Sequence, residues 1–222
     1  WTFQKATVCF FLAKFLKSET TDEMFLQEFR AHKHKVDLEI FTDGSKCQEK
    51  VGSGFVLKRG ESVEKFPLRI VDHSSVFVAE LFAIRAAIFN IKNLENVCCC
   101  IYSDSRSALQ AIDKFYSRHP LVQKIQESIS QCRSRGVIIS LCWVPSHVGI
   151  GGNTLADDVA KAALKLTTFA SNDISASDFK QFLKNKIMEK WQSEWDILVN
   201  KNETPLTDIQ FSVNKTRDIK GL

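Results

Sequence analysis

Four acidic residues, far apart in the sequence, have types and positions that could support catalysis together. They are Asp43, Glu80, Asp104 and Asp157. Carboxylates gathered in one cleft repel one another, so such a cluster is costly unless cations neutralise it. Oxygen ligands with open water positions suit Mg²⁺ or Mn²⁺, and two such ions about 4 Å apart can promote phosphodiester hydrolysis. The acids therefore predict a two-metal hydrolytic site, provided that the fold brings them together.

Each acid also has a simpler explanation when it is considered alone. Asp43 could form a turn with the following glycine, and Glu80 could be a solvated helix position. Asp104 could cap a helix, and Asp157 could be a first-turn residue that the helix dipole favours. Because short motifs match by chance, the surrounding elements must decide whether the acids meet.

Alternating polar and apolar residues predict an antiparallel meander in the first part of the sequence. The run 38–43 alternates and is stopped by Gly44, as at the end of a strand. Two further strands, at 54–58 and 63–70, follow at hairpin distances. Asp43 would then lie at the end of the first strand.

The middle of the sequence changes to helices that alternate with buried strands. Apolar residues recur at steps of four and three between 77 and 91, which predicts a helix with Glu80 in its early turns. The apolar run 97–102 leads to Asp104 and then to a helical pattern, as in a parallel crossover. A helix at 120–135, a strand at 137–144 and a helix at 153–166 follow. The series predicts an α/β fold with a five-stranded mixed sheet flanked by helices.

The two ends of the chain lie outside this α/β pattern. Residues 1–36 have an amphipathic helical pattern, and residues 167–222 include another one near 178–199. We therefore expect an N-terminal helical extension at 1–36, an α/β domain at 37–166 and a C-terminal helical extension at 167–222.

Composition excludes several classes of protein. The net charge of +4 is spread over 30 basic and 26 acidic residues, which is compatible with a polyanionic partner. The seven cysteines are odd in number and include no C-x-x-C pair, so we expect a reduced, intracellular protein. The apolar stretch 8–16 contains Lys14 and is far shorter than the roughly 20 residues of a membrane span, so no membrane association is expected.

Four short blocks around the acids look like the signature blocks of type 1 ribonuclease H, in the correct order. These blocks are Phe41-Thr42-Asp43-Gly44-Ser45, Val78-Ala79-Glu80-Leu81, Tyr102-Ser103-Asp104-Ser105 and Asn153-Thr154-Leu155-Ala156-Asp157. The resemblance covers about residues 37–166 and implies a ribonuclease H-like fold.

The resemblance also implies a site and a reaction. Asp43, Glu80 and Asp104 would be the carboxylate core and Asp157 the fourth metal ligand. Helical periodicity alone does not choose between Asp157 and Asp158, because neighbours point about 100° apart. The implied reaction is endonucleolytic hydrolysis of the RNA strand of an RNA/DNA hybrid with two Mg²⁺ ions per site, Mn²⁺ being the alternative ion.

The segment 143–150 resembles one particular group of ribonuclease H domains. Its sequence Trp-Val-Pro-Ser-His-Val-Gly-Ile resembles the RNase H domains that follow the reverse transcriptase in non-LTR retrotransposons. This implies a covalently linked upstream reverse transcriptase as a partner. His147 matches the loop histidine that assists catalysis or product release in the family, and a histidine in a loop is suited to proton transfer.

Contacts with the hybrid are implied at five further positions. They are Gly44, Ser45, Ser75, Arg106 and Asn153. Ser75 would hold a DNA phosphate at a helix start, where free N–H groups attract anions, and Asn153 would face the RNA strand. The simpler alternatives are a capping serine, a solvated arginine and a capping asparagine. A hybrid has 2′-hydroxyls on one strand of a wide minor groove, so cleavage should be largely independent of sequence.

Two other functions remain open for this sequence. The first is a DNA-directed nuclease or transposase of the same fold, although proofreading exonucleases carry Asp-x-Glu on the first strand and this chain has Asp43-Gly44-Ser45. The second is a catalytically silent module that binds nucleic acid. The interval from Asp104 to His147 is also short, which suggests that the basic protrusion of cellular bacterial enzymes is missing.

Overall fold

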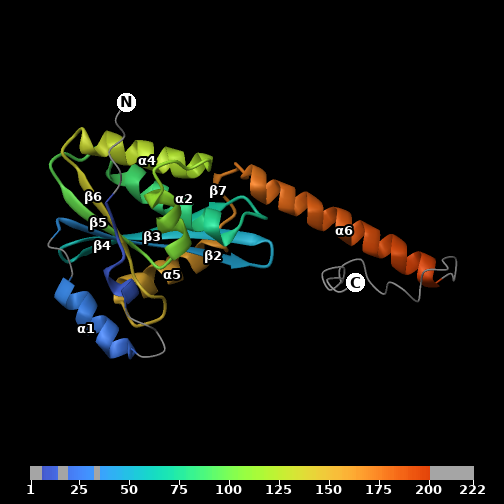
Figure 1. Ribbon diagram of the computed structural model, residues 1–222, viewed down its shortest axis with the longest axis horizontal. Coiled ribbons are helices and arrows are strands. Elements are labelled where there is room, and N and C mark those ends of the chain that lie inside the picture. The colour runs from blue at the N-terminus through green and yellow to red at the C-terminus, as the bar shows by residue number, and fades with distance from the viewer. Residues whose placement is uncertain (1–6, 15–19, 33–35, 201–222) are drawn as a thin grey trace. The chain divides into compact units, whose positions relative to one another are not determined.

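The structure, a computed structural model, describes residues 7–14, 20–32 and 36–200 (Figure 1). The chain divides into two units, one ending at Asp173 and one beginning at Ile174. The first unit is built on a mixed sheet with helices on both faces, as the alternation of strands and helices predicted.

The predicted meander forms the middle of the sheet. Strand β2 (Leu38–Cys47) pairs antiparallel with β3 (Lys50–Arg59), and β3 pairs antiparallel with β4 (Ser62–Ile70). Strand β3 starts at Lys50 and not at residue 54 as predicted. Its glycines do not interrupt the strand, because they lie where a helix packs closely against it. A Cβ at Gly52 would lie 2.3 Å from the carbonyl oxygen of Ala160 in the covering helix.

Two parallel strands extend the sheet beyond β2. Strand β5 (Cys98–Ser103) pairs with β2, and β6 (Ile138–Trp143) pairs with β5, both in parallel. Helix α2 (Val76–Ile91) connects β4 to β5, and α3 (Arg106–Asp113) and α4 (Pro120–Arg133) lie between β5 and β6 in the chain. The helix α5 (Gly151–Ala163) follows β6.

The helices cover the sheet in two layers. Apolar residues of α2, α3 and α4 share one buried cluster with alternate residues of the strands. Residues of α5 pack against the other face, together with residues from the N-terminal segment. Figure 1 shows α2 and α4 above the sheet and α1 and α5 below it. This layering places α2 and α5 on opposite sides of β2.

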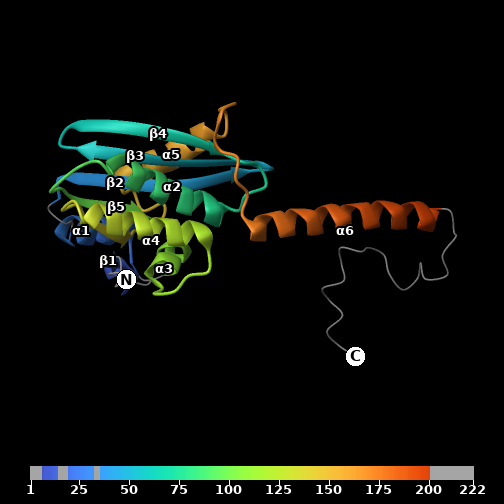
Figure 2. The same ribbon diagram turned by 90° about the horizontal axis from the view of Figure 1, so that it is seen from above.

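The prediction of five strands was wrong, because the described residues alone form a sheet of seven strands. Their order is β1-β6-β5-β2-β3-β4-β7. The two additional strands are β1 (Thr7–Cys9), which pairs with β6, and β7 (Phe169–Ser171), which pairs with β4. Figure 2 shows β4, β3, β2 and β5 side by side. Both new strands have three residues, too few to show a period, and they pair with N–H and C=O groups at the sheet edges.

The predicted N-terminal extension is helical only in part. After β1 come a short 3₁₀ helix, η1 (Phe11–Lys14), and then α1 (Asp22–His32). Residues 1–6, 15–19, 33–35 and 201–222 belong to the two predicted extensions and lie outside the described residues. The helical prediction for those residues stays a prediction.

The second unit contains the helix predicted near 178–199. It is α6 (Ala176–Asn200), and its first turn is capped by Ser175 Oγ, which accepts a hydrogen bond from Asp178 N at 3.1 Å. Within the described part of the chain, no helix is both long and apolar enough to cross a bilayer.

Candidate active site

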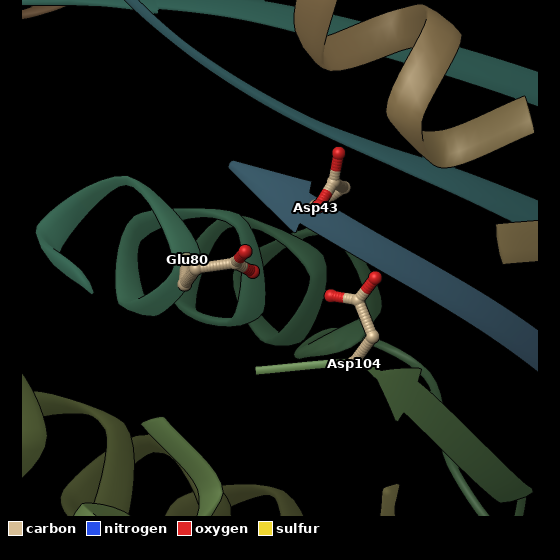
Figure 3. Close-up of side chains that lie close together, drawn as sticks. All are labelled: Asp43, Glu80 and Asp104. Carbon is tan, nitrogen blue, oxygen red and sulfur yellow. The ribbon is translucent and has the colours of Figure 1, made fainter. Parts of the chain in front are cut away.

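Three of the four predicted acids meet where the parallel pairing of β2 with β5 ends. The prediction that the first strand stops at Gly44 was wrong, because β2 stays paired with β3 as far as Cys47. Asp43 lies in β2 and Asp104 follows β5, and the pairing of Thr42 with Ser103 brings the two acids side by side. Glu80 comes from α2, which covers this end of β2. Carboxylate oxygens of the three residues lie within 4.8 Å of one another (Figure 3). This separation would allow all three to bind one shared cation.

Close packing between α2 and β2 brings Glu80 into this group. A Cβ at Gly44 would lie 2.8 Å from the backbone nitrogen of Glu80 and 2.9 Å from Ala79 Cβ, so only glycine fits there. Ser53 Oγ, on β3, donates a hydrogen bond of 2.8 Å to the carbonyl oxygen of Ala79. Gly44, proposed from the resemblance as a hybrid contact, therefore also has a packing role at the site.

Burial and mutual repulsion disfavour the charged forms of the three carboxylates. Burial, with repulsion from Asp104 and Asp157, raises the pKa of Asp43 to about 7. Burial, with repulsion from Asp43 and Asp104, raises the pKa of Glu80 well above its usual range. Burial also raises the pKa of Asp104, although a hydrogen bond from Asn153 opposes this effect. A bound cation would relieve these costs.

The donor set fits a hard divalent cation. All three groups offer carboxylate oxygens, the ligands that Mg²⁺ and Mn²⁺ prefer. Glu80 Oε2 is buried and accepts no hydrogen bond from the protein. A buried acceptor without a donor is rare and costly, and a cation would satisfy it.

Asp157 lies across a cavity from this group. The cavity measures about 200 Å³ and is lined by Asp43, Asp104 and Asp157 among others. The Asp157 carboxylate is not within the 4.8 Å group, and its Oδ2 accepts a hydrogen bond of 2.6 Å from Lys161 Nζ. Asp158 is exposed and does not line the cavity. Helix α5 is therefore oriented so that Asp157, and not Asp158, faces the cavity. Helical periodicity alone could not choose between these two neighbours.

His147 lies on a loop at the rim of the same cavity. Its side chain is exposed, while Val148 and Ile150 on the same loop are buried. The backbone of His147 has a φ of +59° and that of Gly149 a φ of +77°. A non-glycine residue in this left-handed region persists only when the surrounding packing holds it. The histidine is therefore displayed by a loop whose apolar residues anchor it.

Asn153 and Trp143 hold Asp104 in place, a role that the sequence did not reveal. Asn153 is buried, and its Nδ2 donates a hydrogen bond of 3.0 Å to Asp104 Oδ2. Trp143 Nε1 donates one of 3.0 Å to the Asp104 backbone oxygen. The helix cap is Ile150, so Asn153 is not the capping residue. No pattern in the sequence signals these contacts, because they depend on how β6 and α5 meet.

The other proposed hybrid contacts differ in their relation to the cavity. Gly44 lines it, whereas Ser45, Ser75 and Arg106 do not. Ser75 is the N-cap of α2, where its Oγ accepts a hydrogen bond of 3.3 Å from Val78 N. Arg106 is exposed at the start of α3.

Comparison with protein families agrees with this geometry. The model of the RNase H family matches residues 35–165, which is more than half of the 222 residues. The matched region contains the three clustered acids, Asp157 and the histidine loop. Both the α/β fold class and the resemblance to ribonuclease H are thereby confirmed, and the chain belongs to the RNase H family.

Proposed function

We propose that this protein is an endonuclease that hydrolyses the RNA strand of RNA/DNA hybrids with two divalent cations. Asp43, Glu80, Asp104 and Asp157 would hold the ions, Mg²⁺ or Mn²⁺. The observation that carries the proposal is the group of three carboxylates, two buried and one partly buried, within 4.8 Å of one another and beside a cavity. Such a group is unfavourable without cations, so its presence supports a metal-dependent reaction.

The cations would supply an activated water and would stabilise the charge on the leaving oxygen. The residues of the chain have separate tasks in this scheme. Asn153 and Trp143 orient Asp104, and the close approach of α2 at Gly44 fixes Glu80. His147 is exposed at the cavity rim, where its imidazole could exchange a proton with the cleaved strand.

The substrate and context follow from the family and from the loop motif. An RNA/DNA hybrid is proposed as the substrate because the chain is an RNase H family member. The sequence of 143–150 supports an origin in a retrotransposon-derived protein with a linked upstream reverse transcriptase. All seven cysteines are free thiols, which supports an intracellular location.

Cleavage of a labelled hybrid in Mg²⁺ tests this function. The parent should cut the RNA strand, and Asp104→Asn should lower the rate roughly 10²- to 10³-fold, the scale for losing a group that stabilises transition-state charge. Asp157→Asn should be strongly impaired, whereas the matched control Asp158→Asn should stay near the parent. A parent that binds the hybrid without cutting it would indicate a silent binding module, and metal-dependent cutting of the DNA strand would indicate a DNA-directed nuclease.

A further inference from the structure

We propose that the N-terminal segment is a positioning element for the loop that displays His147. The segment consists of β1, η1 and α1 and is called the N-terminal brace below. The inference rests on the function proposed above, because it concerns the histidine of that same site. The brace precedes residue 35, where the match to the RNase H family begins, so it is an addition to the matched domain.

The first contact of the brace is with the strand that leads into the loop. Strand β1 pairs in parallel with β6, with Val8 beside Leu141 and Cys9 beside Cys142. Strand β6 ends at Trp143, the residue whose indole donates to the Asp104 backbone oxygen. The brace thus covers the outer edge of β6 immediately before the chain turns into the His147 loop.

The second contact is with the loop itself. Leu12, Phe25 and Phe29 of the brace are buried. They belong to one cluster with three buried residues of the loop, namely Val144, Val148 and Ile150. The Leu26 side chain also lies 3.5 Å from the position of a Cβ at Gly149. The apolar anchors on both sides of His147 therefore share one buried cluster with side chains that the brace supplies.

The third contact reaches the strands that carry the carboxylates. The Phe29 ring packs edge-on against Tyr102, with ring centroids 5.3 Å apart. Tyr102 in turn stacks on Phe41 at 4.8 Å. Tyr102 and Phe41 each stand two residues before a clustered acid, Asp104 and Asp43 respectively. The brace therefore supports both the histidine loop and the strand ends beneath the acids.

The conformation of the loop explains why it needs this support. His147 and Gly149 both have positive φ values, +59° and +77°. The strained histidine backbone is held by the burial of its neighbours and not by a helix or strand of its own. Loss of the Leu26 side chain, which lies beside Gly149, should let the loop move and take His147 out of its productive position. The Phe29 contact with Tyr102, beneath the acids, would be kept.

Leu26→Ala tests the proposal, because Leu26 is only half-buried and its side chain lies beside Gly149 of the loop. Amide hydrogen exchange at residues 145–150 should accelerate roughly tenfold, as expected for a locally destabilised segment. In hybrid cleavage, kcat should fall roughly 3- to 10-fold with KM unchanged, because binding groups are retained. The matched control is Leu94→Ala, a half-buried leucine packed on the opposite face of the sheet, which should change neither readout.

A double-mutant cycle with His147→Ala separates positioning from general stability. If the brace acts through the histidine, Leu26→Ala should cause no further loss of kcat in the His147→Ala protein. Equal losses in both backgrounds, or unchanged exchange at 145–150, would overturn the proposal. If Leu26→Ala does not fold, Leu26→Val replaces it with smaller effects in the same directions. A parent that does not cut hybrids would refute the proposed function, and the exchange result would then decide alone whether the brace holds the loop.

Discussion

At the scale of single residues, Asp104 accepts hydrogen bonds at both its side chain and its backbone. Burial raises its pKa, and the hydrogen bond from Asn153 Nδ2 acts against that rise. The same bond fixes the orientation of the carboxylate, and a second bond from Trp143 fixes the backbone that carries it. Residues that orient a metal ligand commonly matter almost as much as the ligand itself.

Asn153→Ala should therefore impair cleavage without removing any acid. The pKa of Asp104 should rise, because the bond that favours its charged form is lost. We expect activity to fall roughly 10- to 100-fold at neutral pH and to recover in part at higher pH. The measurement is the pH profile of kcat/KM. Thr154→Ala, at a residue lining the same cavity, is the control and should keep the profile of the parent. An Asn153→Ala profile without a shift would refute the orienting role.

The sequence predicted the acids better than the residues that orient them. Asp43, Glu80 and Asp104 each stand in a short motif that resembles a ribonuclease H block, so their grouping could be predicted from the sequence. The hydrogen bonds from Asn153 and Trp143 to Asp104 depend on side chains crossing between elements. Such contacts have no period and no fixed spacing, and only the structure reveals them.

At the scale of elements, close approach of helices to the sheet positions the site. Strand β3 lets α5 approach closely at its glycines. A Cβ at Gly54 would lie 2.7 Å from Val159 Cγ1 and 2.8 Å from the backbone nitrogen of Ala160. Helix α5 also carries Asp157 and Asn153, so displacement of this helix would move both residues.

Gly54→Ala should consequently affect both stability and activity. The added methyl group meets backbone that cannot move aside, so we expect a loss of about 1 to 3 kcal/mol in the free energy of unfolding. Urea denaturation measures this loss, and hybrid cleavage should also decrease. At Gly151, in the first turn of α5, an added Cβ meets nothing within 4 Å. Gly151→Ala should be neutral or slightly stabilising, and equal losses in the two variants would argue against the packing explanation.

The long elements could be predicted from the sequence, and the short ones could not. The helix at 77–91 was expected from its apolar stripe, and the structure has it at Val76–Ile91. Strands β1 and β7 have three residues each and are stabilised by the edges that they join. Their partners, β6 and β4, lie far away in the sequence, so no local pattern could have indicated the pairing.

At the scale of the whole molecule, the clustered acids make the free energy of unfolding depend on pH and on divalent cations. The pKa of Asp43 is raised from 3.8 to about 7, and those of Glu80 and Asp104 are raised as well. The folded state therefore holds protons that the unfolded state has released. The contribution of Asp43 to stability is fully present below its unfolded pKa of 3.8 and is lost as the pH rises through about 7. Glu80 and Asp104 contribute with the same sign.

Divalent cations should reverse this loss, because they bind the ionised carboxylates of the folded state only. We expect Mg²⁺ to raise the unfolding temperature by roughly 5 °C at pH 8 and by much less at pH 5, where protons already neutralise the acids. Thermal unfolding followed by circular dichroism, at constant ionic strength, measures both values. Asp43→Asn removes one charge from the cluster, so without Mg²⁺ it should lose less stability than the parent between pH 5 and 8. Equal Mg²⁺ stabilisation at both pH values would contradict binding at the carboxylates, since competition with protons is unavoidable there.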